Sequence, residues 1–552
     1  MRKRVTVTLD GLPIVCEAGT SVQSLIWEHL PERRREAIAV RVNGSVKGLR
    51  WQPGQDCEGV LLTYADEEAR RMYERSARFL FLLGAREVMP GARVRFEHSV
   101  GYGLYIVIEG GEQLSGLRVR RIEQRMRQIV EADEPFVRAR WTRAQAMEYF
   151  ERDGQADKLR LLRYRPFDYF DVYTCRGMSE YFYGEMLPST GYIHSVSLQF
   201  HLPGAVLQLP APVRPDRIAP FQERPKLLRT FAEAARWAGI LGCRNAADLN
   251  DLITGKRFRS FIRVNEALQE KSIADIADQI VERGARVVLI AGPSSSGKTT
   301  FAHRLAVALR INGLKPLAIS LDSYYRDRDK IPLDKDGQPD LECLESLDLP
   351  LFNDHLVRLL QGEEVEAPRF SFPRGRRDPV GVRLKAHPDQ PLLIEGIHGL
   401  NNRLTEDVPA EMKFTIFISA LAHLNLDDHN RIRTTDVRLL RRLVRDHQFR
   451  GATVDRTMSM WDSVRAGEEA YIFPFQEQAD VMFNSSLLYE LPILKRYAYP
   501  MLCEIGEDSP WHLRARRLVK FLNYFLEGDA EDEIPPTSIL REFIGGCTFD
   551  KE

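Results

Sequence analysis

Cysteine is scarce in this chain of 552 residues: there are seven, and none of them forms a CxxC pair. An odd number of scattered thiols predicts neither a disulfide framework nor a zinc ribbon, and it is typical of free thiols in a reducing cytoplasm. No run of about 18 apolar residues is present, so we expect no membrane-spanning helix and no membrane partner. The basic start MRKRVTVTLDG alternates apolar and polar residues, which predicts a strand rather than a signal peptide.

The chain also lacks net charge, because 78 lysines and arginines balance 78 aspartates and glutamates. A balanced chain has no overall positive field to attract nucleic acid, which argues against nucleic acid as a partner. The guanine-reading motif NKxD is absent, which disfavours a GTPase. One hydrophobic core is not enough for this length, so we expect about three or four domains. Whether copies of the chain form a homo-oligomer stays open.

The first 65 residues predict a small domain rich in strands. RVTVTL (4–9) alternates with period two, and the turn signal DG (10–11) follows it. Ser21 can cap a helix, and the pair NG (43–44) is the strongest short hairpin signal. This pattern resembles the TGS domain, a β-grasp (ubiquitin-like) module of threonyl-tRNA synthetases and some GTPases.

Residues 66–224 resemble the second additional domain of threonyl-tRNA synthetase, an α+β editing domain. Its HxxxH and CxxxH motifs supply metal-binding and editing residues. In this chain Tyr102 follows His98 and Ser179 follows Cys175 at those spacings. Two of the four expected ligands are therefore replaced by side chains that bind zinc poorly or not at all. We expect the domain to keep its fold without a working metal-binding or editing site. The alternative is that Cys175 and His98 still form a metal site.

Three further segments complete the predicted organisation. Residues 225–280 form a helical connector, because SIADIADQIVER repeats isoleucine at three- to four-residue steps. Residues 281–528 form a larger domain, and residues 529–552 form a linker and a tail. The acidic stretch GDAEDEIPP (528–536) predicts a flexible joint, and SILREFIGG predicts a short docking segment.

The larger domain begins with a strand, a glycine-rich turn and an amphipathic helix in RVVLIAGPSSSGKTTFAHRLAVALR (286–310). The turn satisfies GxxxxGK[ST], in which glycines let backbone N–H groups curl round phosphates at a helix amino terminus. In such a loop Lys298 reaches the β- and γ-phosphates and the Thr299 hydroxyl binds Mg²⁺, so the predicted cofactors are ATP and Mg²⁺. The predicted nucleotide-binding residues are Gly292, Pro293, Ser294, Ser295, Ser296, Gly297, Lys298, Thr299 and Thr300.

Two acidic residues follow predicted strands of this domain. A strand in 315–327 ends near Asp322, and another in 391–400 ends at Glu395. With strands in 413–420 and 479–486 they predict an α/β domain built on a doubly wound parallel sheet. Ligands of such sheets bind at the carboxyl ends of strands, so both carboxylates should face the site. Asp322 suits a general base on an acceptor hydroxyl and Glu395 a carboxylate that holds Mg²⁺ or its water, whereas helix capping is the plain alternative.

The segment TTDVRLLRRLVRDHQFRG (434–451) predicts a helix with an apolar face and an arginine face. Cations on one face repel unless anions meet them. A solvated surface, partly neutralised by nearby aspartates, is one interpretation. Beside a phosphate loop we favour a lid whose arginines close over ATP and stabilise the transferring charge. The arginine face comprises Arg438, Arg441, Arg442 and Arg445.

The order and spacing of these motifs resemble the uridine kinase and phosphoribulokinase family. That family carries GxSxSGKTT, DSFYR, a Pro-Tyr-Asp-Phe segment, EGI and DxRLxRRxxRDxxxRG. This sequence has GPSSSGKTT, DSYYR (322–326), PRFSF (368–372), EGI (395–397) and DVRLLRRLVRDHQFRG (436–451). The resemblance implies a P-loop kinase that uses MgATP to phosphorylate the 5′-hydroxyl of a nucleoside such as uridine or cytidine. It implies Asp322, Lys298, Arg441 and Arg445 as catalytic residues, Arg442 as a nucleotide contact, Thr299 and Glu395 as metal ligands, and Tyr325, Phe370, Arg377 and Arg438 as substrate contacts.

One motif departs from that family, because Phe370 stands where it has tyrosine and Ser371 where it has aspartate. Fewer polar groups are then available to reject a wrong acceptor, which leaves the acceptor open. A second hypothesis is a kinase of the same fold acting on another small alcohol or a sugar phosphate, with a cationic pocket from Arg374, Arg376 and Arg377. A third is an NTP-dependent regulator that binds RNA or tRNA, which the synthetase-like half suggests.

Overall fold

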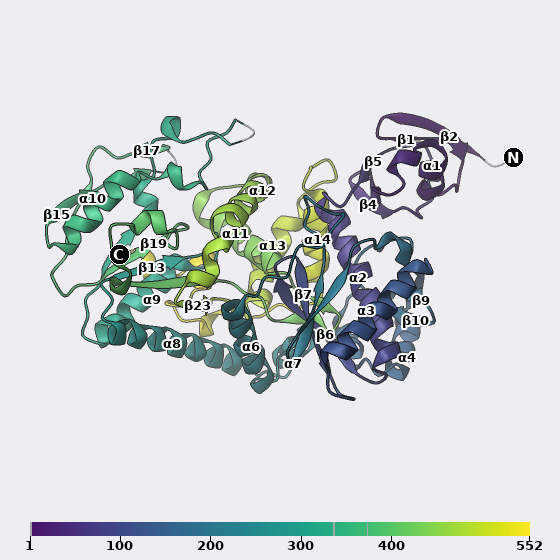
Figure 1. Ribbon diagram of the computed structural model, residues 1–552, viewed down its shortest axis with the longest axis horizontal. Coiled ribbons are helices and arrows are strands. Elements are labelled where there is room, and N and C mark those ends of the chain that lie inside the picture. Colours follow the sequence, from purple (N-terminus) through teal and green to yellow (C-terminus); the bar gives the residue numbers. More distant parts are fainter. Residues whose placement is uncertain (1–2, 335–336, 372–373, 552) are drawn as a thin grey trace.

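The computed structural model describes residues 3–334, 337–371 and 374–551. In Figure 1 the two chain ends lie on opposite sides of the molecule, with a small amino-terminal sheet on the right and the carboxyl terminus beside β13 (Val287–Ala291) on the left. The long helix α8 (Phe258–Arg283) runs along the lower edge of the left half. Within the described part of the chain, no helix is long and apolar enough to cross a membrane.

The amino-terminal unit is a five-stranded sheet that packs on one helix. The strand order is β2-β1-β5-β3-β4, in which β1 and β5 are parallel and the other neighbours antiparallel. Ser21 caps the helix, since its side chain accepts from the Ser24 N–H, and Asn43 and Gly44 both adopt positive φ in the predicted hairpin turn. The elements are β1 (Arg4–Leu9), β2 (Leu12–Glu17), α1 (Val22–His29), β3 (Ala39–Val42), β4 (Ser45–Gly48) and β5 (Cys57–Leu62).

The middle of the chain forms two antiparallel sheets covered by helices, with strand orders β11-β12-β7-β6 and β10-β9-β8. Its long helix α2 is buried along most of its length, because Phe79, Leu80 and Phe81 pack into the core between the sheets and α3. The elements are α2 (Glu67–Val88), β6 (Arg93–Val100), β7 (Gly103–Glu109), α3 (Gly116–Glu131), β8 (Val137–Thr142), α4 (Arg143–Arg152), α5 (Ala156–Tyr164), β9 (Tyr169–Cys175), β10 (Met178–Glu180), β11 (Ser197–His201) and β12 (Gly204–Gln208).

The carboxyl-terminal half contains the predicted parallel sheet, with the order β14-β19-β13-β20-β23. In chain order this is 2-3-1-4-5, so the winding reverses at β13, whose five residues are all buried. The remaining strands are β14 (Leu317–Ser320), β15 (Glu364–Ala367), β16 (Phe370–Ser371), β17 (Arg376–Arg377), β18 (Val382–Lys385), β19 (Leu392–Glu395), β20 (Lys413–Ser419), β21 (Asn425–Asp427), β22 (Asn430–Arg431) and β23 (Val481–Asn484). The helices are α9 (Lys298–Ile311), α10 (Leu349–Leu360), α11 (Thr434–Arg450), α12 (Val454–Tyr471), α13 (Glu490–Cys503), α14 (His512–Leu522) and α15 (Arg541–Ile544).

The predicted connector is helical, and it belongs to the main hydrophobic core. It contains α6 (Pro225–Ile240), α7 (Ala246–Thr254) and α8. Ile273 and Ile276 of α8 lie in the same apolar cluster as Phe301 of α9 and Phe150 of α4. One core therefore continues from the middle of the chain into the parallel-sheet half, and the exact domain boundaries stay a prediction.

The acidic stretch before the tail is docked, which corrects the expectation of a flexible joint. Ala530 and Ile534 are buried in the main core. Between them Asp532 and Glu533 form ion pairs with Arg259 and, for Glu533, also with Arg263 of α8. The local sequence is acidic and contains prolines, but basic residues of a distant helix neutralise it.

A buried group of charges joins the middle of the chain to the hairpin formed by β21 and β22. Lys158 Nζ lies 2.7 Å from Glu180 Oε1 and 3.5 Å from Asp427 Oδ1, and His429 Nδ1 lies 2.7 Å from Glu180 Oε2. Lys158, Glu180 and Asp427 are all fully buried. Burial opposes ionisation of Glu180, but Lys158 and His429 outweigh it and lower the pKa to about 2.

Replacing Lys158 should destabilise the protein strongly, because two carboxylates would stay buried without their cation. We expect Lys158→Met to lower the free energy of unfolding by about 3–5 kcal/mol in urea titrations. The matched control is Arg86→Met, which removes an ion pair with Asp153 whose arginine side chain is 52% exposed. It should cost less than about 1 kcal/mol. Equal losses in the two variants would contradict a structural role for the buried group.

Candidate active site

Three neighbouring strand ends bring the predicted acids and the glycine-rich loop together. The loop follows β13, Asp322 lies in a 3-10 turn (Leu321–Tyr324) after β14, and Glu395 ends β19, which pairs with both strands. Ser320 at the end of β14 donates a hydrogen bond to Glu395 Oε1 (2.7 Å). The site thus lies at the carboxyl edge of the sheet, beside the central strand where the winding reverses.

The loop itself has the shape and the unsatisfied donors that fit phosphate oxygens. A Cβ on Gly292 would lie 2.0 Å from the Ile418 carbonyl oxygen, and Gly297 adopts a φ of +83°, so both positions require glycine. The hydroxyls of Ser295 and Ser296 are buried and have no hydrogen-bond partner among the described residues. Lys298 folds back over the loop, where its Nζ donates to the carbonyl of Gly292 at 3.0 Å and that of Pro293 at 3.3 Å.

A buried ion pair holds the loop from behind. The Ser294 N–H donates to Glu468 Oε1 (3.0 Å), and Arg438 Nε donates to the Ser294 carbonyl (2.9 Å). Arg438 and Glu468 also bond to each other, and their side chains are 1% and 0% exposed. We call these contacts the Ser294 clamp. The clamp corrects the prediction that Arg438 contacts substrate, because its guanidinium is committed to the loop backbone and to Glu468.

The other arginines of α11 are not an exposed lid either. Arg441 is fully buried, where it donates to Glu490 Oε2 (2.6 Å) and to the Ser485 carbonyl (2.8 Å). Arg442 donates to the Ser294 hydroxyl (2.8 Å), and Arg445 to Asp446 (2.8 Å). The helix packs against α12, α13 and α15, so the structure corrects the lid prediction. Arg442 and Arg445 stay candidates for contact with phosphate.

The carboxylates around Lys298 disfavour one another's ionisation. Burial and then the charge of Asp322 raise the pKa of Glu395 to about 7, which Lys298 opposes. The Asp322 side chain is open to the cleft, yet the dense surrounding protein raises its pKa too, against Lys298, Arg450 and Arg445. Asp322 and Glu395 thus both interact electrostatically with the lysine of the loop.

Three residues of the site were missed by the sequence analysis. Burial and then Glu468 raise the pKa of Glu342 to about 7, and Arg442 and Lys298 oppose this shift. Arg450, in the last turn of α11, interacts electrostatically with Asp322 and Glu542. The third is Glu542 of the tail, which bonds to Thr300. Arg450 belongs to the quoted arginine motif, but no local signal marks Glu342 or Glu542.

The predicted substrate side is partly assembled. The rings of Tyr325 and Phe370 lie 5.6 Å apart, and the Tyr325 hydroxyl donates to the Leu341 carbonyl (3.0 Å). Phe372 and Pro373 of the same predicted segment lie outside the described residues. Tyr325 and Phe370 therefore form one aromatic wall near Asp322, whose charge contributes to the raised pKa of Tyr325.

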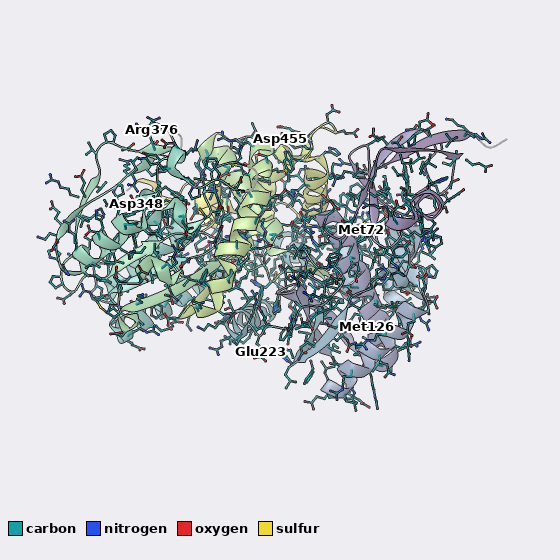
Figure 2. All side chains as sticks on the ribbon, turned by 45° about the horizontal axis from the view of Figure 1, so that its top comes forward. Met72, Met126, Glu223, Asp348, Arg376 and Asp455 are labelled. Carbon is teal, nitrogen blue, oxygen red and sulfur yellow. The ribbon has the colours of Figure 1, made fainter. Side chains whose placement is uncertain are left out.

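Arg377 and Arg374 are committed to other contacts, which corrects their assignment to a substrate pocket. Arg377 donates to the carbonyls of Tyr324 and Tyr325 (both 3.0 Å) and to Asp348 (3.1 Å). Arg374 pairs with Asp378. Figure 2 labels Asp348 and Arg376 in this outer part of the carboxyl-terminal half. Arg377 thus stabilises the backbone just after Asp322, at Tyr324 and Tyr325.

The predicted metal ligands are few, which suits Mg²⁺. Thr299 is exposed, and the Glu395 carboxylate interacts electrostatically with Lys298, which precedes Thr299 in the loop. Among the described residues no group of three or more His, Cys, Asp or Glu side chains could hold a metal ion. Mg²⁺ needs no such cage, since it is usually bound through one or two protein ligands together with water and substrate phosphates.

The synthetase-like part places its two predicted ligands in different surroundings. The His98 ring stacks on Phe231 of α6, with centroids 3.8 Å apart. Cys175 packs in the core with Phe182 and Met186, and burial raises its pKa to about 12. A thiol with such a pKa is a poor nucleophile and a poor metal ligand. That this half has lost its site stays a prediction.

A large cavity lies away from the phosphate loop. It measures about 1200 Å³ and opens where the amino-terminal sheet, α2, α12 and α14 meet. Among the described residues, Arg438 is the one residue of the predicted phosphate and substrate site that lines this cavity, and the same side chain forms the Ser294 clamp. The residues that line the cavity in the described part of the chain include none of the loop residues 292–300, so it is distinct from the predicted phosphate-binding site.

The loop after the central strand and the acids at the two neighbouring strand ends define a P-loop kinase domain. Residues 287–488 match the model of the Phosphoribulokinase / Uridine kinase family. A uridine kinase of Lactobacillus helveticus is 28% identical over 197 residues, which are 36% of this chain and 84% of the relative. A uridine kinase of Deinococcus deserti is 29% identical over 197 residues, 36% of this chain and 86% of the relative. A threonine–tRNA ligase of Desulforamulus reducens is 27% identical over 196 residues, 35% of this chain and 31% of the relative.

The raised pKa of Glu395 predicts a pH-dependent stability. Folding raises this pKa from 4.5 to about 7, so the folded state binds more protons between these values. The free energy of unfolding should therefore fall by up to about 3 kcal/mol as pH rises from 4.5 to 7. We expect Glu395→Gln, which keeps an acceptor for Ser320, to remove this contribution and to leave the similar contribution of Glu342, so that the slope in urea titrations becomes shallower. The exposed Glu411→Gln should keep the wild-type slope, and an unchanged slope in Glu395→Gln would contradict the assignment.

Proposed function

We propose that the kinase domain transfers the γ-phosphoryl group of ATP to the 5′-hydroxyl of a nucleoside of the uridine or cytidine type. The observation that carries the proposal is that Asp322 interacts electrostatically with Lys298 of the loop and with Tyr325, whose ring lies 5.6 Å from that of Phe370. The named relatives that align with the kinase domain are uridine kinases, which supports a nucleoside acceptor.

The phosphate side is provided by the loop. Its backbone N–H groups and the unpaired hydroxyls of Ser295 and Ser296 can bind phosphate oxygens, and Lys298 can leave its carbonyl contacts to reach the terminal phosphates. Arg442 and Arg445, at the loop end of α11, can neutralise charge that develops on the transferring group. Thr299 and Glu395 would hold Mg²⁺, which would offset the negative charge of the phosphates.

The acceptor side is provided by the segment after β14. Phe370 is partly exposed and packs against the buried Tyr325, and its ring offers an apolar surface on which a flat base can lie. Asp322 can then accept the proton of the hydroxyl as it attacks. Its raised pKa makes it a better proton acceptor at neutral pH than an ordinary aspartate.

The structure favours this acceptor over a sugar phosphate. A phosphorylated acceptor needs cations that are available to it, but Arg374 and Arg377 are already bound to Asp378, Asp348 and backbone carbonyls. The RNA-binding alternative keeps its support in the threonine–tRNA ligase relative. An assay of purified protein with MgATP, a panel of nucleosides and sugar phosphates, and RNA separates the three. RNA-stimulated loss of ATP without a phosphorylated small molecule would replace the proposal.

Removing the base should slow catalysis without preventing nucleotide binding. We expect Asp322→Asn to lower turnover with the best nucleoside by about two to four orders of magnitude. MgATP binding, measured by calorimetry, should be retained, because the phosphate loop is intact. The control Asp329→Asn changes an exposed aspartate seven positions further along and should be near wild type. Near-normal turnover of Asp322→Asn would remove this residue from the mechanism.

A further inference from the structure

A carboxylate of the chain's own tail lies at the phosphate-binding end of α9. The Thr300 N–H donates to Glu542 Oε2 at 3.3 Å, and the Thr300 hydroxyl donates to the same oxygen at 2.8 Å. Thr300 is the third residue of α9, so its N–H is one of the donors that the helix leaves unpaired. In a P-loop these donors cradle the α- and β-phosphates. An anion of the protein therefore occupies a position that the nucleotide needs.

The tail that carries Glu542 is firmly built into the domain. Ile539, Leu540 and Phe543 are fully buried, and the Ser538 hydroxyl donates to Glu266 Oε1 (2.7 Å). Ile539 packs directly on the loop, where a Cβ on Gly297 would lie 2.4 Å from its Cγ2. The tail backbone consequently stays in place when the site is used.

The Glu542 side chain, in contrast, has room to leave. It is only partly buried, between the anchors Ile539 and Phe543. Arg450 already interacts with its charge and also with that of Asp322. This arginine offers a second partner for the Glu542 carboxylate at the rim of the cleft. The side chain can thus exchange Thr300 for Arg450 without undocking of the tail.

We propose that Glu542 is a built-in competitor for the nucleotide's phosphate and a determinant of nucleotide affinity at this site. The inference rests on the proposed function, since it needs a nucleotide at the loop. A nucleotide binds only after the carboxylate has left the Thr300 donors, and it then lies beside a like charge. The tail thereby sets a weaker affinity than the loop alone would give.

Calorimetric titration of the full chain with MgATP tests the inference. Glu542→Gln removes the charge and weakens the bond to Thr300 while keeping the side-chain size, so MgATP should bind about tenfold more tightly. The matched control is Glu533→Gln, which removes one negative charge from the same tail, where it pairs with Arg259 and Arg263. The control should change affinity less than about twofold, since Arg259 and Arg263 already neutralise Glu533 away from the phosphate loop.

The outcomes separate this inference from the proposed function. If wild type binds MgATP and Glu542→Gln binds it with the same affinity, the inference is overturned and the kinase proposal stands. An equal gain in both variants also overturns it, because the effect is then one of general charge. Tight binding by Glu542→Gln alone supports it. Binding by neither protein overturns the inference and the proposed nucleotide site together. Glu542→Asp, whose shorter side chain reaches Thr300 less well, should give an intermediate affinity.

Discussion

The conformation of the phosphate loop depends on the Ser294 clamp. Arg438 and Glu468 bind the carbonyl and the N–H of one residue and also bind each other, with both charges removed from water. Burying such a pair is costly unless its hydrogen bonds are satisfied, and loss of one partner leaves an uncompensated charge. The loop is therefore shaped by two helices behind it as well as by its own glycines.

The clamp also connects the loop to the amino-terminal half. The first turn of α11 holds Asp436, which accepts from Arg71 of α2 and from Arg517 of α14. Burial opposes the ionisation of Asp436, but the two arginines lower its pKa well below the ordinary value. One helix thus carries an ion pair to the amino-terminal half at Asp436 and the support of the phosphate loop at Arg438, two residues later. The two halves are therefore joined by ion pairs as well as by the main hydrophobic core.

The sequence predicts those parts of the site that depend on local pattern. The glycine-rich loop, its helix and the acids at strand ends follow from motifs that span few residues, and the parallel sheet aligns them. The roles of the arginines could not be predicted this way, because their partners are distant in sequence. Glu468 lies 30 residues from Arg438, and Glu490 lies 49 residues from Arg441. An arginine stripe on a helix has the same local pattern whether it meets phosphate or buried carboxylates.

The charges of the cleft explain why its acids can coexist. Glu395 and Glu342 both have pKa values near 7, so at neutral pH neither is fully ionised beside Asp322. A divalent cation at Glu395 would favour the ionised form, and binding would release a proton. The site then carries its full negative charge only when a cation is there to balance it. Lys298 opposes the raised pKa of all three carboxylates, and Arg445 and Arg450 act on Asp322, so the cations of the loop and of α11 limit the charge that the acids must bear.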